Sequence, residues 1–263
     1  MESNQQPQRA FIGPWRTAIV NRHLQIGPAA AAVLLIGAVV GCNLPPGSPS
    51  PSAEPSATPE PSVAEPSPSD AAGLPVGSSH VLWNRAGDVQ ISVTIPNAGW
   101  SGEGSFLVKD DTAEPPDGAG IVVFVGDLYV YGDPCHWAST TPDAPATTVD
   151  EVIAALAAQA SRDASAPADI TVDGYAGKSI TLHLPDDAVF NECDGDTFGS
   201  WAGGGDPVSA GPSRSHQGPG QIDEVWILDV NGVVTVLDWA YYEGTPADVV
   251  TELRALVESA TFE

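Results

Sequence analysis

Basic residues are scarce in this sequence. Its 263 residues include nine Lys and Arg against 34 Asp and Glu, which gives a formal net charge of −25 at pH 7. Nucleic acids and anionic lipid headgroups are bound through Lys and Arg that displace counterions, so this composition excludes nucleic acid as a partner. The excess acidic residues are typical of a solvated surface that keeps a protein soluble.

Catalytic signatures are also absent. The sequence contains no Gly-x-Ser-x-Gly elbow, no His-Glu-x-x-His zinc motif and no Gly-rich phosphate loop. Ser, His and Asp residues all occur, but their spacing selects no triad. We therefore predict no cofactor and expect a protein that is not an enzyme.

An apolar run over residues 26–40 follows three Arg residues and ends just before Cys42. The order Val39-Val40-Gly41-Cys42 resembles the lipobox of bacterial lipoproteins, whose Cys carries the lipid anchor. The run is shorter than the roughly 20 residues of a spanning helix, so residues 1–42 are predicted to be a signal peptide with lipidated Cys42. The alternative is an uncleaved membrane-spanning anchor. Both place the domain on the outer face of the membrane, because the positive charges precede the run.

Residues 43–72 consist mainly of Pro, Ser, Ala and Glu. A segment with so little to bury cannot offset the entropy of ordering, so we predict a disordered stalk that its prolines stiffen. Residues 73–263 then form a single extracytoplasmic domain. A stalk suits a domain that stands clear of the membrane or passes through a cell wall.

The three Cys residues indicate an oxidising compartment. If Cys42 carries lipid, Cys135 and Cys193 remain as one disulfide pair. Such a bridge closes a long loop and contributes up to about 4 kcal/mol. The alternative is a metal site formed by Cys135, His136, Cys193 and Asp194, although the spacings typical of zinc sites are missing.

The apolar pattern predicts mainly strands. Alternation of apolar and polar residues indicates a strand with one buried face over 89–95. Short turn signals predict three hairpins: 121–125 with 128–131, 170–172 with 179–184, and 222–230 with 233–239. The last signal is the strongest, because Asn231-Gly232 favours positive φ at both turn residues.

Two helices are predicted. The first, 148–160, begins with the capping box of Thr148 and Glu151, and the second, 246–259, follows Thr245 as its cap. The predicted fold class is α+β, with a single antiparallel sheet of about six to eight strands built from hairpins and packed by these two helices. Residues 203–220 are rich in Gly, Pro and Ser and are predicted to be a mobile loop.

Two segments carry a resemblance to known proteins. Residues 133–137 and 193–201 contain the patterns Asp-Pro-Cys-x-Trp and Cys-Asp-Gly-x-x-Phe-x-Ser-Trp, which resemble a widespread group of uncharacterised exported bacterial proteins. The ending 256–262 resembles the closing helix of PsbP-like and LpqN-like lipoproteins, whose fold is a sheet sandwiched with helices. The resemblance implies export and this fold, it is consistent with the disulfide, and it implies no activity.

Aromatic residues near the two Cys suggest a binding site. Trp137 and Trp201 are candidates to line an apolar ligand pocket, with His136 beside it. Arg214 and His216 lie on the predicted mobile loop, which would act as a lid.

A calcium loop is the weaker candidate. Asp194 and Asp196 begin with the Asp-x-Asp spacing of such a loop, but Phe198 stands where an oxygen ligand is needed. We therefore predict no metal site.

These features predict a monomeric, membrane-tethered binding module of the cell envelope, which presents a pocket or surface to a small molecule or an envelope protein. One alternative is an extracytoplasmic hydrolase that acts on envelope material. It would need clustered carboxylates, or a His with a nucleophile, in one cleft. The other alternative is the external domain of a membrane-anchored sensor.

Intact mass spectrometry of the native protein tests the predicted processing. We expect a mass that corresponds to cleavage before Cys42, addition of lipid to this residue, and loss of one hydrogen from each of Cys135 and Cys193. A full-length mass with three alkylatable thiols would contradict both the export and the disulfide.

Overall fold

The computed structural model describes residues 73–83, 88–109, 117–204 and 206–263. The predictions for residues 1–72, including Cys42 and the stalk, lie outside this part of the chain. Among the described residues, no helix is long and apolar enough to cross a membrane.

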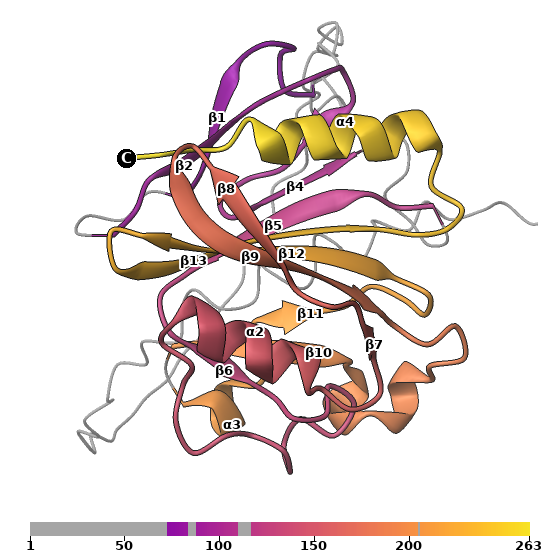
Figure 1. The fold of residues 1–263 in the computed structure, drawn as a ribbon. Coiled ribbons are helices and arrows are strands. Elements are labelled where there is room, and N and C mark those ends of the chain that lie inside the picture. The colour runs from indigo at the N-terminus through magenta and orange to yellow at the C-terminus, as the bar shows by residue number, and fades with distance from the viewer. Residues whose placement is uncertain (1–72, 84–87, 110–116, 205) are drawn as a thin grey trace, which may run out of the picture. The chain divides into compact units, whose positions relative to one another are not determined.

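An eight-stranded antiparallel sheet organises the domain (Figure 1). Seven strands pair in the order β3-β4-β5-β13-β12-β9-β7, and β8 also pairs with β9. The strands span Trp100–Ser101 (β3), Phe106–Lys109 (β4), Gly120–Val125 (β5), Asp163–Ala164 (β7), Ala168–Val172 (β8), Tyr175–His183 (β9), Ile222–Val230 (β12) and Val233–Tyr241 (β13). The predicted α+β class with one main antiparallel sheet is confirmed.

The β12–β13 hairpin forms the middle of this sheet. Its register runs without interruption from Val230 opposite Val233 to Ile222 opposite Tyr241. Asn231 and Gly232 adopt φ values of 56° and 85°, as the predicted turn requires. The β8–β9 hairpin and its turn at Asp173-Gly174 are also present, with positive φ at both turn residues. Strand β9 begins directly after the turn, so residues 170–172 pair with 175–177 and not with 179–184.

The sheet is covered on both faces, and alternation along β12 shows which residues face each way. Trp226 and Leu228 pack into the core beneath α4 (Ala247–Glu258), whose Leu253 is fully buried. Val225 and Ile227 pack into a second core with α2 (Val149–Ala157). Successive side chains on a strand point to opposite faces, so the two helices lie on opposite sides of the sheet, as Figure 1 shows.

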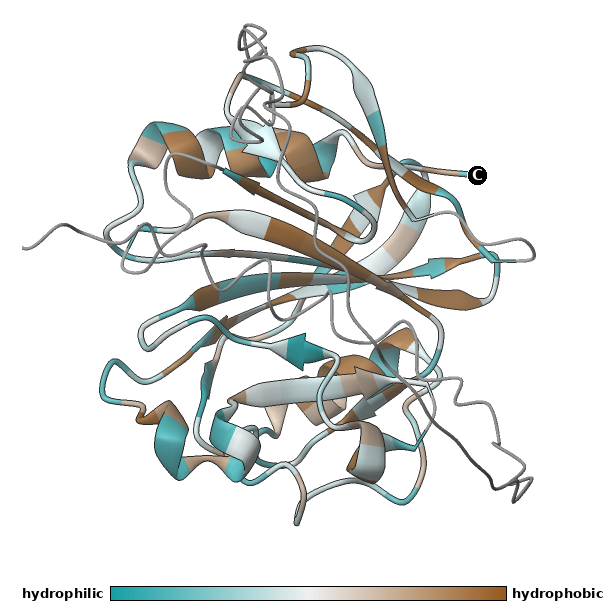
Figure 2. Cartoon of the chain, turned by 180° about the vertical axis from the view of Figure 1, so that it is seen from behind, coloured by the Kyte–Doolittle hydropathy of each residue, from teal (hydrophilic) through white to brown (hydrophobic). Residues whose placement is uncertain are grey.

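Two three-stranded sheets complete the described part of the chain. One comprises β1 (Ser79–Trp83), β2 (Ile91–Thr94) and β14 (Thr261–Phe262), which contribute to the core beneath α4. The other comprises β6 (Leu128–Val130), β10 (Gly199–Gly203) and β11 (Arg214–Ser215), of which β6 and β10 contribute to the core with α2. Figure 2 shows hydrophobic residues concentrated along the central strands.

The predicted hairpin of 121–125 with 128–131 is wrong. Strand β5 already pairs with β4 on one edge and β13 on the other, so it has no free edge for β6. Gly126, with φ of 100°, turns the chain away, and β6 pairs with β10 instead. A turn signal between two apolar runs therefore did not establish that the runs pair with each other.

Both predicted helices are present, and only one begins as expected. Thr148 and Glu151 form the capping box of α2. Thr245 does not cap α4, because its hydroxyl donates to the Gly118 carbonyl at 3.0 Å and accepts the Tyr242 N–H at 3.0 Å. Pro246 is the N-cap residue, and it makes no side-chain capping bond.

Candidate functional site

Cys135 and Cys193 form a disulfide that spans 58 residues of sequence, with their Cα atoms 4.5 Å apart. Backbone bonds continue the connection, since Asp194 N–H donates to the Cys135 carbonyl at 2.9 Å and Gly199 N–H to the Pro134 carbonyl at 2.8 Å. The bridge therefore fastens the segment after β6 to the segment before β10. Because both sulfurs are consumed, the alternative of a thiolate metal site is wrong.

The residues proposed to line a pocket lie in different surroundings. His136 is exposed, while the half-buried Trp137 donates its Nε1–H to the Asp194 carbonyl at 2.7 Å. Trp201 is only 1% exposed and packs edge-on against Phe124, with the ring centroids 5.3 Å apart. The two Trp side chains therefore take part in separate packing contacts.

Residues 203–220 were predicted to be a mobile lid without regular structure, but the structure places a helix and a strand in this segment. The described residues of this segment, 203–204 and 206–220, contain helix α3 (Pro207–Ala210) and strand β11. Arg214 and His216 are 3% and 6% exposed, so neither can swing over a pocket as a surface lid residue. The physical reason is that buried carboxylates on β12 and β13 hold these side chains, as described below.

Asp194 and Asp196 lie in the short 3-10 turn η3 (Asp194–Asp196). The Asp194 carboxylate accepts the Ala138 N–H at 2.9 Å, and Gly195 and Asp196 take φ values of 60° and 55°. No group of three or more His, Cys, Asp or Glu residues in the described part of the chain is arranged to hold a metal ion.

A buried charge cluster connects β10 and β11 to the central hairpin. Its two Arg and two Asp side chains are at most 3% exposed. Six elements or connections supply its members, which are Arg162, Ser200, Arg214, His216, Gln221, Asp223 and Asp238. Burial of an ion costs free energy unless the ion is paired and hydrogen-bonded, so the pairing of these residues is a condition of the fold.

Asp223 lies at the centre of the buried charge cluster. Its Oδ2 accepts a hydrogen bond from Arg162 Nη2, and its Oδ1 accepts one from Arg214 Nη2 at 2.8 Å. Arg214 also donates through Nε to Asp238 Oδ2 and through Nη1 to the Ser215 carbonyl at 2.8 Å. Two guanidinium groups thus balance two carboxylates away from water.

Ser200, His216 and Asp223 have the spacing of a serine hydrolase triad. Ser200 Oγ lies 2.6 Å from His216 Nε2, and His216 Nδ1 lies 3.1 Å from Asp223 Oδ2. These partners favour the tautomer whose Nδ1–H donates to Asp223 and whose Nε2 accepts the serine hydroxyl proton. However, Ser200 is fully buried and its Oγ accepts a bond from Arg162 Nη1 at 2.6 Å, so no substrate reaches the nucleophile in this conformation.

The electrostatics of the buried charge cluster keep His216 neutral. Burial lowers the pKa of His216 to about 3, and the guanidinium groups of Arg214 and Arg162 act in the same direction against the pull of Asp223. Burial alone would raise the pKa of Asp223, but its hydrogen-bonded partners hold that pKa well below its ordinary value. Burial raises the pKa of Asp238 to about 6 despite its bonds from Arg214.

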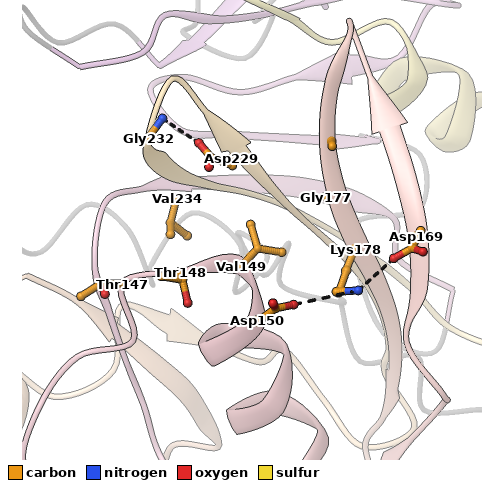
Figure 3. Close-up of a pocket in the computed structure, with 11 residues that line it drawn as sticks. Thr147, Thr148, Val149, Asp150, Asp169, Gly177, Lys178, Asp229, Gly232 and Val234 are labelled. Carbon is orange, nitrogen blue, oxygen red and sulfur yellow. Dashed lines mark hydrogen bonds and ion pairs between the residues drawn. The ribbon is translucent and has the colours of Figure 1, made fainter.

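A solvent-accessible cavity lies elsewhere, between the N-terminus of α2, the β8–β9 hairpin and the β12–β13 hairpin (Figure 3). We call it the α2 cavity, and its volume is about 440 Å³. Three carboxylates, one ammonium and two threonines share its lining with small and aliphatic residues. The lining residues are Thr147, Thr148, Val149, Asp150, Asp169, Ala176, Gly177, Lys178, Asp229, Gly232 and Val234.

None of the residues that line the α2 cavity was predicted to be a site residue. Thr148 and Gly232 were identified only as parts of a capping box and a turn. In the buried charge cluster, five residues were also missed, namely Arg162, Ser200, Gln221, Asp223 and Asp238. A signal did exist for one of them, because Asp238 is the one charged residue in the apolar run 233–239. A carboxylate inside a strand that is otherwise apolar indicates a buried ion pair.

No family model matches this chain, and no curated protein matches it. Several solved structures are similar to this chain. LpqN of Mycobacterium tuberculosis, involved in cell envelope biogenesis, is 14% identical, with a TM-score of 0.37, over 70% of this chain and 90% of LpqN. Cyanobacterial PsbP from Synechocystis is 14% identical, with a TM-score of 0.32, over 73% and 96% of the two chains.

The third structure is a protein of Bacteroides thetaiotaomicron that is 8% identical, with a TM-score of 0.31, over 66% of this chain and 45% of that protein. LpqN and PsbP belong to the families that residues 256–262 resemble. All three TM-scores lie below 0.5, so the architecture of this domain rests on its own strand pairing.

The neutral state of His216 predicts a specific loss of stability in acid. Unfolded His216 takes up a proton near pH 6.5, whereas the folded imidazole stays neutral down to about pH 3. Lowering the pH through this window therefore favours the unfolded state, by up to about 1.4 kcal/mol per pH unit from this group. Denaturant unfolding of wild type and His216→Gln is the measurement. The stability advantage of wild type is expected to shrink as the pH falls from 6.5 to 5.

Asp238 has the opposite dependence, because the folded state protonates it first as the pH falls from about 6 to 3.8. Both proteins retain Asp238, so its contribution cancels in the comparison. His183→Gln removes an exposed imidazole from β9 and is the matched control, which should keep the wild-type slope. A difference between wild type and His216→Gln that does not vary with pH would show that His216 is solvated.

Proposed function

We propose that this protein is a membrane-tethered, extracytoplasmic binding module of the cell envelope that binds a small molecule through the α2 cavity. The proposal depends on a difference in solvent access between two sites of the domain. The α2 cavity is open and lined by polar side chains, whereas the Ser200, His216 and Asp223 set is sealed in the interior. Binding needs an accessible concave site, and catalysis needs an accessible nucleophile.

Two observations support the proposed location outside the cytoplasm: the Cys135–Cys193 disulfide and the apolar run that precedes Cys42. The Cys135–Cys193 disulfide is stable in an oxidising compartment. The proposal also includes residues 1–42 as signal peptide or anchor, residues 43–72 as stalk, and residues 73–263 as a single, monomeric domain. In this arrangement the apolar run that precedes Cys42 directs export, and the lipid or the anchor retains the protein at the outer face.

Filling the α2 cavity tests the proposed binding site. Ala176 is exposed on β9 and lines the cavity, so Ala176→Trp is expected to block it without disturbing the core. Native mass spectrometry after incubation with small molecules extracted from the cell envelope should show a bound mass on wild type and none on Ala176→Trp. Ala166→Trp places the same ring on an exposed residue outside the cavity and should behave as wild type. Equal retention by both variants would contradict the assignment.

The geometry of Ser200 and His216 favours a hydrolase as the second candidate function. A fluorophosphonate probe, which labels activated serines, separates the two functions. The binding module predicts no more labelling of wild type than of Ser200→Ala. Labelling of wild type that disappears in both Ser200→Ala and His216→Gln would establish the hydrolase and overturn the non-catalytic assignment.

A further inference from the structure

We infer that the α2 cavity binds a short aliphatic amine, a proposal that rests on the proposed function and names the ligand class of the same site. The charges of the lining provide the first argument. Lys178 Nζ lies 2.8 Å from Asp169 Oδ1 and 3.9 Å from Asp150 Oδ1, so its ammonium is matched mainly by Asp169. Its pKa is raised by the hydrogen bond and charge of Asp169, which keeps it protonated. The lining retains an excess of negative charge.

Asp229 provides the second argument. Its Oδ1 accepts the N–H of Gly232 at 2.6 Å, and no cationic side chain among the described residues forms an ion pair with it. Figure 3 shows Asp229 on the hairpin and Asp150 on the helix, with Val149 and Val234 between them. A ligand that carries an ammonium group would meet an exposed carboxylate on either side of the cavity, and the strongly acidic protein attracts cations to it.

The apolar part of the lining narrows the ligand class. Val149, Ala176 and Val234 offer aliphatic contacts, and no aromatic ring lines the cavity. Without a ring to stack on, a flat or cyclic ligand gains little, whereas methylene groups pack against valine side chains. The aliphatic part of the Lys178 side chain, of which two-thirds is covered, adds to this apolar lining. The volume of about 440 Å³ suits a small molecule.

Calorimetry with 1,5-diaminopentane tests the ligand class. Pentane-1,5-diol has the same chain length without charge, and glutarate has the opposite charge. We expect the diamine to bind and the diol and glutarate to bind at least about ten-fold more weakly, because only the diamine gains charge-assisted hydrogen bonds. Ala176→Trp should abolish diamine binding, and Ala166→Trp should not.

Two substitutions test the sign of the ligand charge. Asp229→Asn keeps an oxygen that can accept the Gly232 N–H, so the turn is preserved, and we expect diamine binding to weaken about five-fold. Lys178→Met removes the competing ammonium, and we expect diamine binding to tighten by a similar factor. Asp187→Asn changes an exposed carboxylate outside the cavity and should leave the affinity unchanged. Circular dichroism should show that all three variants keep the wild-type fold.

The outcomes separate the ligand class from the proposed function. No diamine binding, or weaker diamine binding by Lys178→Met, would overturn the amine assignment. If the diol or glutarate binds and Ala176→Trp abolishes that binding, the cavity remains the binding site while the amine class is wrong. If Ala176→Trp binds the diamine as wild type does, the diamine associates with the acidic surface in general, and the amine assignment to the cavity fails.

Discussion

The pairing of Asp223 with two guanidinium groups is the constraint on which this domain depends. Arg162 and Arg214 both donate to the Asp223 carboxylate in the interior, and His216 lies against it. A lone carboxylate at this position on β12 would be too costly to bury. The connection after α2 and the segment that contains β11 must therefore fold inward and meet the central hairpin.

The disulfide and the buried charge cluster form one connected unit. Gln159 donates to the carbonyls of Tyr131 and Ser200, and therefore links the disulfide-fastened segments to α2. The Phe198 ring packs edge-on against the His216 ring, with centroids 5.5 Å apart. Closure of the disulfide holds the chain that covers the cluster, which excludes water and strengthens the ion pairs inside.

This enclosure explains how triad geometry is compatible with the non-catalytic role that we propose. The hydrogen bonds between a Ser, a His and an Asp can activate a nucleophile. In the interior of a protein, the same bonds also satisfy three buried polar side chains. Arg162 donates a hydrogen bond to Ser200 Oγ and therefore occupies the side of this oxygen that an electrophile would have to reach. Access then separates the two roles. The α2 cavity is an accessible polar site, where Lys178, Asp150 and Asp229 come from three different elements.

The sequence by itself determined the features that depend on near neighbours: the capping box of Thr148 and Glu151, and the turns at Asp173-Gly174 and Asn231-Gly232, where backbone sterics act over a few residues. Counting Cys residues also identified the Cys135–Cys193 pair. Tertiary structure alone decided that β6 pairs with β10, that His216 is buried, and that α2 and two hairpins line an open cavity. Those outcomes depend on which strand edges and charged side chains, far apart in the sequence, remain unpaired after the sheet forms. A local sequence pattern contains no information about these distant partners.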